Sequence, residues 1–365
     1  MTHNAPRNAT VDIARGIGII LVVLGHNWTV LQDKGELFRV IYSFHLPLFF
    51  FLSGVLLKDS APLGPFALSR ADALLKPYFV VLVLLGVAHM LAPRAFPVTA
   101  TTPLAYFSGV LYGTTSTVAW TPLWFLPHLF VASLVAMAIL RATRALENRT
   151  AWLFLITCAL LAAGIAWMSR FWQIDTARLN FMGLERLPGL PWSLDLTFFS
   201  TACMLAGFLL RKTVMDMHFS PIRLLVAVLA FAFLHGYFDE TIDLNLRAYG
   251  DPLVCTLQAA LGIYIVLCAS ALLQRYAPLR RSLSYIGSAS LFILLFHYTA
   301  QGRTFLVLSH ISDNRYLLGA ASLAAGVLLP LAILALVRRQ RHLAALLLPL
   351  RSRSSLPQNA PHKSP

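Results

Sequence analysis

Three ionisable side chains lie close to or within the first apolar stretch of the chain. Asp12 and Arg15 are three residues apart, so on a helix they share a face and can form an ion pair. His26 is eleven positions beyond Arg15, a separation of about 16 Å along a helix axis. Because histidine is suited to proton transfer near neutral pH, His26 is a candidate general base.

A second histidine, His45, opens the next apolar stretch, two residues before Pro47. A short connection joins the two stretches, so we expect His26 and His45 to lie close enough to line one cavity. Beyond the second stretch, Arg70 and Lys76 flank the start of a third. Such cations either fix the orientation of the protein in a membrane or hold the phosphates of an anionic substrate.

The elements that must position these groups follow from composition. The chain has 365 residues, of which 58% are hydrophobic and 12% charged, and its mean hydropathy is +0.70. This excludes an ordinary soluble domain and a disordered chain. A bilayer core about 30 Å thick needs about 20 apolar residues for each helix that crosses it. Ten segments fit this length: 13–31, 41–57, 73–92, 119–140, 151–169, 194–210, 221–237, 252–273, 286–309 and 316–337.

The distribution of charge predicts the orientation of these segments. If both termini are cytoplasmic, 20 of the 29 Lys and Arg residues lie on the cytoplasmic side, with 5 of the 15 acidic residues. The positive-inside rule favours this orientation. The net charge of +14 therefore encodes topology rather than binding to nucleic acid. We expect an all-α, polytopic membrane protein with about ten transmembrane helices.

Ionisable groups inside a bilayer are costly and therefore indicate function. They fit an enzyme with a buried base, but they also fit a transporter or flippase, in which they would form a substrate or proton pathway. A non-enzymatic subunit of a glycan-assembly system is a further alternative. The four cysteines fall in apolar segments without metal-ligand spacing, so we expect no metal site.

Several motifs of this sequence resemble those of the membrane acyltransferase-3 family, in its fucose O-acetyltransferase-like branch. Arg15, ten residues and then His26 match the first hallmark of that family. The stretch from Ser43 to Gly54 matches the second. Weaker matches are Leu123–Pro127, Pro191–Asp195, Asn245 with Tyr249–Pro252, and Ser284–Gly287 through Ser290 to His297.

The resemblance implies a bacterial inner-membrane O-acetyltransferase. Such enzymes transfer an acyl group, usually acetyl, from cytoplasmic acyl-coenzyme A to a hydroxyl of a surface or exported glycan, such as an exopolysaccharide or O-antigen. Acetyl-coenzyme A is then a donor substrate, and no cofactor is bound permanently. Residues 8–337 would form the transmembrane domain, and residues 338–365 a basic, Ser/Pro-rich cytoplasmic tail.

The resemblance also suggests roles for individual residues. His26 would be the catalytic base or acyl carrier, with Arg15 and His45 as its catalytic partners. Coenzyme A would contact Arg70 and Lys76, and Asp12 would hold Arg15. The acceptor would contact Trp124, Trp192, Tyr249, Asn245 and His297, although the three aromatic residues are more typical of anchors at a membrane interface.

This sequence departs from the family pattern in two places. Many relatives carry two arginines where this chain has Arg70 followed by the displaced Lys76. His128 stands where a small or apolar residue is expected, as an extra polar group for the cavity.

Overall fold

The computed structural model describes residues 8–98, 100, 102–171 and 189–350. Most of the connection between the predicted segments 151–169 and 194–210, and the end of the predicted tail, lie outside the described residues. The described part is helical almost throughout, with one short hairpin. Its elements are α1 (Ala9–Gly25), α2 (Trp28–Asp33), α3 (Glu36–Val55), α4 (Leu63–Arg70), η1 (Ala71–Leu75), α5 (Lys76–Leu91), α6 (Pro103–Tyr112), η2 (Thr121–Trp124), α7 (Phe125–Ala142), α8 (Arg149–Arg170), η4 (Pro191–Leu196), α9 (Thr197–Leu209), α10 (Arg211–Met215), α11 (Pro221–Tyr237), β1 (Ile242–Asp243), β2 (Ala248–Tyr249), α12 (Pro252–Leu273), α13 (Ala277–Ser288), α14 (Ser290–Ser309), α15 (Arg315–Arg339) and α16 (Arg341–Leu347).

Within the described residues, eight helical segments are long and apolar enough to cross a membrane. They are Glu36–Val55, Leu63–Leu91, Thr121–Ala142, Arg149–Arg170, Pro191–Leu209, Pro252–Leu273, Ser290–Ser309 and Arg315–Arg339. Of the other two predicted segments, each contains a 17-residue helix, α1 or α11. The prediction of an all-α, polytopic membrane protein is confirmed.

The first predicted segment is interrupted where the sequence pattern continues. The first segment was expected to reach residue 31, but α1 ends at Gly25 and α2 begins at Trp28. Asn27 causes this break, because its buried side chain caps α2 and donates to Gln301, Gly319 and Ser322 at 3.0–3.1 Å. The helix ending at His26 therefore turns at the level where the sequence places the candidate base.

Close packing between α1 and α13 sets the position of Arg15. A Cβ atom at Gly16 would overlap the carbonyl of Leu283, and one at Gly287 would overlap the carbonyl of Asp12. The two backbones can approach this closely only because both residues lack side chains. Since α14 starts at Ser290, just beyond Gly287, this contact brings α14 next to Arg15.

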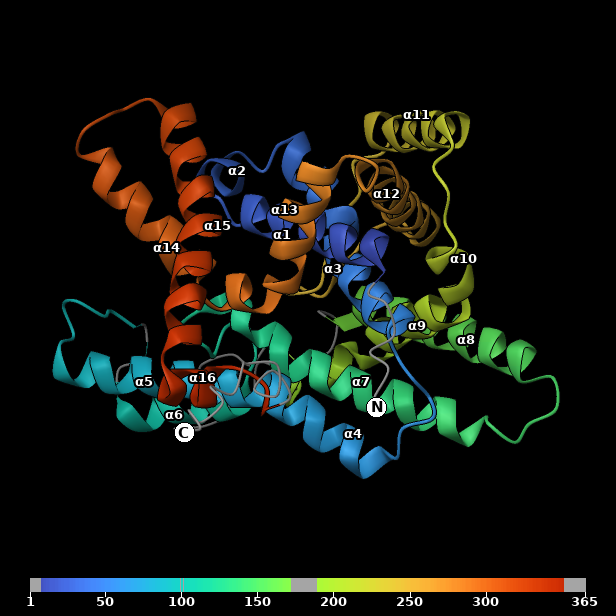
Figure 1. Ribbon diagram of the computed structural model, residues 1–365, viewed down its shortest axis with the longest axis horizontal. Helices are drawn as coiled ribbons and strands as arrows, with labels where there is room; N and C mark the ends of the chain where they lie inside the picture. The colour runs from blue at the N-terminus through green and yellow to red at the C-terminus, as the bar shows by residue number, and fades with distance from the viewer. Residues whose placement is uncertain (1–7, 99, 101, 172–188, 351–365) are drawn as a thin grey trace, which may run out of the picture.

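Figure 1 shows how the remaining helices enclose the centre of the molecule. Helices α1, α3, α12 and α13 lie together in its upper half, and α5 to α9 lie in its lower half. Helix α3 packs against α1, α9 and α12, and α14 packs along α15. The central helix α3 thus has neighbours on opposite sides, and the two cavities described below lie on different faces of it.

The end of the described chain folds back onto α5. Lys76 Nζ donates to the carbonyl of Leu348 at 2.7 Å, and the N–H of Leu350 donates to the Asp72 carboxylate at 2.7 Å. Helix α16 packs against α5 just before these contacts. The described part of the predicted tail is therefore anchored to the protein itself.

Candidate active site

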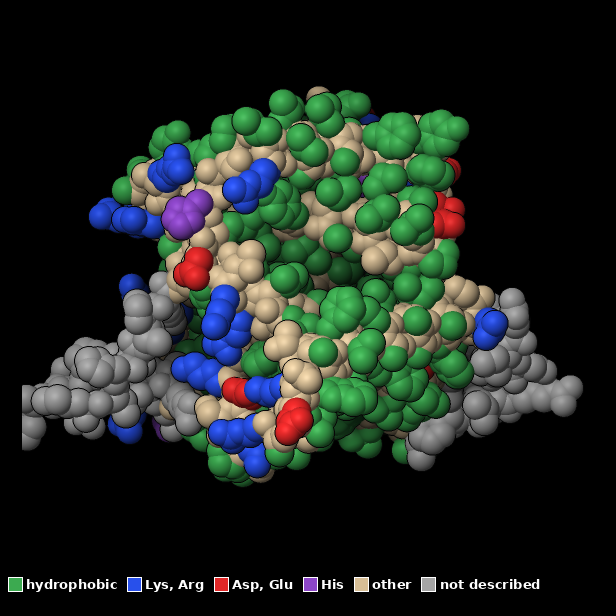
Figure 2. All heavy atoms as spheres, turned by 90° about the vertical axis from the view of Figure 1, so that its right-hand side faces the viewer, with side chains coloured by type: hydrophobic (Ala, Val, Ile, Leu, Met, Phe, Trp, Pro, Cys, Tyr) green, Lys and Arg blue, Asp and Glu red, His purple; other side chains and the backbone are tan. Residues whose placement is uncertain are grey.

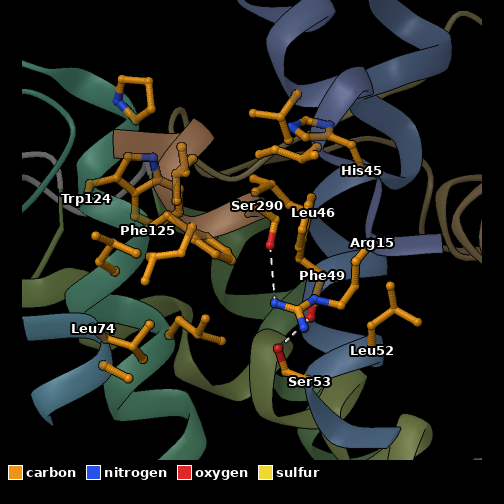
Figure 3. Close-up of a pocket in the computed structure, with 18 of the residues that line it drawn as sticks. Arg15, His45, Leu46, Phe49, Leu52, Ser53, Leu74, Trp124, Phe125 and Ser290 are labelled. Atoms are coloured by element: carbon orange, nitrogen blue, oxygen red, sulfur yellow. Dashed lines mark hydrogen bonds between the residues drawn. The ribbon is translucent and has the colours of Figure 1, made fainter. Parts of the chain in front are cut away.

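A cavity of about 230 Å³ lies between α1, α3, η1, α7 and α14. We call it the central cavity. At one end, the arginine end, it is lined by Arg15, Arg70, Ser53, Leu56 and Leu74; toward the other, the hairpin end, it is lined by His26, His45, Pro122, Trp124 and Asn245. In Figure 3, Arg15 and His45 lie on one wall, and Trp124 of η2 and Phe125 of α7 face them.

The structure brings both predicted histidines, His26 and His45, to the central cavity. His45 lies beside Tyr42, with ring centroids 4.8 Å apart, and its Nδ1 is 2.8 Å from the carbonyl of Ile41. A carbonyl accepts a proton but cannot donate one, so Nδ1 of His45 carries the hydrogen. Its Nε2 is then the nitrogen with a lone pair.

His297 is the third histidine of this group. Its ring centroid is 5.4 Å from that of His26, and it is fully buried. Its Nδ1 faces the carbonyls of Ile293 and Leu294, at 3.1 and 3.0 Å, so this nitrogen also carries the hydrogen. Its Nε2 has no hydrogen-bond partner among the described residues.

His26 itself is held by the backbone rather than by its ring. It is the C-cap residue of α1, and Asn27 beside it is fixed by three hydrogen bonds. Among the described residues no side-chain hydrogen bond is found for His26, while its ring lines the cavity. An imidazole so placed can accept a proton from a molecule in the cavity. The Asn27 network was missed by sequence reasoning, since a lone asparagine carries no motif.

Two positive charges meet at the arginine end. Arg15 donates to the hydroxyl of Ser290 at 3.2 Å (Figure 3), and its charge repels that of Arg70. Arg70 is placed there by η1, a π-helical turn that also directs Ala73 and Leu74 to the cavity. Two like charges repel each other at this end of an apolar cavity. An anion bound between them would offset this repulsion.

The other two residues predicted for the donor lie elsewhere. Lys76 forms an ion pair with Asp72 at 2.6 Å and binds Leu348, outside the residues that line the central cavity. Asp12 lies one turn before Arg15 on α1 and is not among the residues that line the central cavity. Its main-chain carbonyl instead touches Gly287 in the close packing with α13.

At the hairpin end, Asn245 lies in the turn between β1 and β2. Thr115 donates to its side-chain oxygen at 2.7 Å, which leaves the amide N–H groups as donors to other molecules. Asp243 accepts the main-chain N–H groups of Asn245 and Leu246 at 2.9 and 3.1 Å. Burial raises the pKa of the Asp243 carboxyl, against the effect of these two hydrogen bonds.

A buried ion pair supports this turn from behind. Arg247 Nε donates to Asp195 at 3.0 Å, its Nη2 contacts the same carboxylate and Ser193, and its Nη1 donates to the carbonyl of Asn245 at 2.9 Å. Both side chains of the pair are at most 1% exposed. Sequence reasoning missed this pair because the two residues are 52 positions apart and no motif links them.

Trp192 and Tyr249 lie behind the wall of the central cavity rather than in its lining. Trp192 has a φ of +53° and donates its indole N–H to the carbonyl of Leu111 at 2.9 Å. The hydroxyl of Tyr249 is 2.9 Å from that of Thr256. Of the three predicted aromatic residues, Trp124 alone is among the lining residues.

His128, the unexplained departure, packs behind Trp124. Its ring stacks on that of Trp124 with centroids 5.5 Å apart, and its Nδ1 is 3.3 Å from the carbonyl of Trp192. It is fully buried and is not among the residues that line the central cavity. His128 therefore supports the wall at the hairpin end.

Comparison with known proteins identifies one family. A family model described as an acyltransferase domain, that of acyltransferase-3, matches residues 8–337. No curated protein and no solved structure matches the chain. The match covers all the helices that line the central cavity. The chain, a multi-pass membrane protein with ionisable groups enclosed between its helices, therefore belongs to the acyltransferase-3 family.

Proposed function

We propose that the protein transfers an acetyl group from cytoplasmic acetyl-coenzyme A to a hydroxyl of a surface or exported glycan. The observation that carries this proposal is the arrangement of the central cavity. Arginines lie at one end and histidines lie toward the other, about 16 Å away along α1. An anionic donor and a neutral acceptor can then enter from opposite ends and meet near His26.

The arginine end is proposed to bind the donor. The phosphates of coenzyme A would relieve the repulsion between Arg15 and Arg70. Lys76, on the next turn outside the cavity, is a proposed contact for the nucleotide part that remains outside. The apolar side chains of Phe49, Leu52 and Leu74 would surround the arm that carries the thioester.

His26 is proposed to act as the general base. It takes the proton of the acceptor hydroxyl while the hydroxyl oxygen attacks the thioester carbonyl carbon. When the C–S bond breaks, the coenzyme A thiolate leaves and receives that proton from His26. The acceptor keeps the acetyl group as an ester, so charge and protons balance. The alternative is an acetyl group carried briefly on His26 and then passed to the acceptor.

His45 and Asn245 are proposed to orient the acceptor. Because Nδ1 of His45 donates to Ile41, its Nε2 can accept a hydrogen bond from a sugar hydroxyl. The amide N–H groups of Asn245 can donate to a sugar oxygen, since Thr115 occupies the amide oxygen. Trp124 offers an aromatic face to the sugar ring.

The proposed orientation places the arginine end toward the cytoplasm of a bacterium, at its inner membrane. It rests on the excess of Lys and Arg on the side of the two termini. The motif from Ser43 to Gly54 supports the fucose O-acetyltransferase-like branch.

The test uses membranes that contain the full chain, labelled acetyl-coenzyme A and acceptor glycan. We expect His26→Ala to abolish transfer, because it removes the base. The matched control is His89→Ala, since His89 is a half-buried histidine near the end of α5 that lies outside the central cavity and contacts Phe96. Normal transfer by His26→Ala at equal expression would contradict the assignment. A labelled adduct on His26 without acceptor would favour the acetyl-carrier route.

A further inference from the structure

The break between α1 and α2 leaves one main-chain carbonyl of α1 without its helical partner. In a continuous helix the N–H of Asn27 would donate to the carbonyl of Val23, but here it donates to that of Leu24 at 3.0 Å. The carbonyl of Val23 therefore needs another donor, because an unpaired carbonyl inside a membrane protein is costly. Gln301 of α14 supplies this donor, since its side-chain Nε2 lies 2.9 Å from that carbonyl.

The same amide also holds the other side of the break. Oε1 of Gln301 accepts a hydrogen bond from the side chain of Asn27 at 3.1 Å. One side chain thus binds residues 23 and 27, on either side of His26 in the chain. Gln301 is 1% exposed and has partners for both its nitrogen and its oxygen.

A fully paired amide at this depth indicates a specific task. Hydrophobic side chains cover much of the flank of the molecule shown in Figure 2, as expected for a surface that meets lipid. Burying a polar amide in such a protein costs free energy unless its hydrogen bonds are made. The amide of Gln301 makes them with the two sides of the break that carries His26.

Helix α15 encloses the two hydrogen bonds of Gln301. A Cβ atom at Gly326 of α15 would lie only 2.6 Å from Cγ of Gln301 and 2.7 Å from Cγ1 of Val23. Asn27 also donates to the hydroxyl of Ser322 on the same helix, at 3.0 Å. The side chain of Gln301 therefore has no space to move toward α15, and the break is fixed between α14 and α15.

The face of α14 that carries Gln301 also meets α1 further along. Ser290 accepts a hydrogen bond from Arg15 at 3.2 Å, and the ring centroid of His297 lies 5.4 Å from that of His26. Ser290, His297 and Gln301 follow one another at intervals of seven and four residues, so they share one face of α14. This face therefore contacts α1 at both candidate catalytic residues.

We propose that Gln301 is a positioning residue, which fixes where the imidazole of His26 lies in the central cavity. The proposal rests on the proposed function, because it concerns the base of that reaction. Gln301 is not among the residues that line the cavity, so it acts through the main chain on both sides of His26. A displacement of about 1 Å at a reacting group costs about a hundredfold in rate.

The first test is Gln301→Met, which keeps a long side chain but forms neither hydrogen bond. The full-length protein in lipid nanodiscs is assayed with labelled acetyl-coenzyme A and acceptor glycan. We expect kcat to fall about tenfold to a hundredfold. The KM values for both substrates should stay the same, because the groups proposed to bind them are unchanged. Equal kcat for Gln301→Met and the wild type would overturn the proposal.

The matched control is Gln258→Met. Gln258 is a fully buried glutamine of α12, but its amide has no hydrogen-bond partner among the described residues, and it lies outside the lining of the central cavity. This variant should keep the kcat of the wild type. If Gln301→Met does not fold, the isosteric Gln301→Glu takes its place, since an ionised carboxylate cannot donate to the carbonyl of Val23.

A second measurement separates this proposal from the proposed function. Diethyl pyrocarbonate modifies accessible imidazole nitrogens, and mass spectrometry gives the rate of modification of the peptide that contains His26. We expect Gln301→Met to change this rate and Gln258→Met to leave it unaltered. A changed rate in a protein whose wild type transfers no acetyl group would support the positioning role and contradict the proposed function alone. An unchanged rate in Gln301→Met would overturn the positioning role.

Discussion

The two ends of the central cavity are built in different ways. At the hairpin end, Asn245 is held by Thr115, Asp243 and Arg247, and Arg247 is itself bound to a buried carboxylate. At the arginine end, two like charges face one cavity, and the neighbouring Lys76 is engaged with the end of the chain. The hairpin end is thus preorganised for a neutral ligand, whereas the arginine end gains stability when an anion arrives.

The largest effect is expected from breaking the buried ion pair of Arg247 and Asp195, which supports the hairpin end. Arg247→Met leaves the Asp195 carboxylate buried without its partner, and we expect a loss of about 3–5 kcal/mol in the free energy of unfolding. A thermal unfolding midpoint measured in detergent would fall strongly. The double variant Arg247→Met with Asp195→Leu is the control, since it removes both charges. Equal midpoints for the single variant and the wild type would show that the hairpin end does not depend on this pair.

The second largest effect is expected at the arginine end, on the KM for acetyl-coenzyme A alone. Arg15→Gln removes one charge from the arginine end, and a charge-assisted hydrogen bond contributes about 1.5–3 kcal/mol. We therefore expect the KM for acetyl-coenzyme A to rise about tenfold to a hundredfold while that for the acceptor stays the same. Steady-state kinetics with each substrate varied in turn measure this separation. A rise in the acceptor KM alone would place the donor at the other end.

The corresponding substitution at the hairpin end is expected to have a smaller effect, on the KM for the acceptor. Asn245→Ala removes neutral hydrogen-bond donors, each of which contributes about 0.5–1.5 kcal/mol. The acceptor KM should rise about twofold to tenfold, with the KM for acetyl-coenzyme A unchanged. Asn245→Asp keeps the oxygen that accepts from Thr115 but loses the N–H groups, so it should behave like the alanine variant. Full activity in Asn245→Asp would show that the amide donates nothing to the acceptor.

The smallest effect is expected at Lys76. Its ion pair with Asp72 is partly exposed to solvent, and such pairs contribute about 0–1 kcal/mol. Lys76→Met should therefore change the KM for acetyl-coenzyme A by about fivefold or less. Limited proteolysis should show a more accessible chain end, because the hydrogen bond to Leu348 is lost. An effect as large as that of Arg15→Gln would assign Lys76 to the donor site itself.

Much of this arrangement follows from the sequence. The ten apolar segments all contain helices, and the spacing of Arg15 and His26 places them along one cavity, with His45. Hydrophobic length and helical rise are local properties, so they can be read from a single stretch. The position of Lys76 is local as well: it lies six residues from Arg70, and side chains six apart do not share a helix face.

Other features depend on contacts between distant residues. Asn27 ends α1 because Gln301 and Ser322 meet it, more than 270 positions further along the chain. The ion pair of Asp195 and Arg247 joins η4 to the turn between β1 and β2, and each of these charges counted singly indicates only topology. Such polar contacts inside a membrane protein carry no periodicity, so a sequence pattern does not reveal them.

Helix α3 forms a partition one helix thick between two compartments. Phe49 lines the central cavity, and Phe51 lines a second cavity, of about 330 Å³, on another face of α3, although only one residue separates them. Side chains two positions apart on a helix point in nearly opposite directions. Substitutions along this helix therefore sort by the direction of the side chain rather than by position in the chain: one register changes the central cavity, and the other changes the second cavity. Either cavity can thus be altered from α3 without a change in the lining of the other.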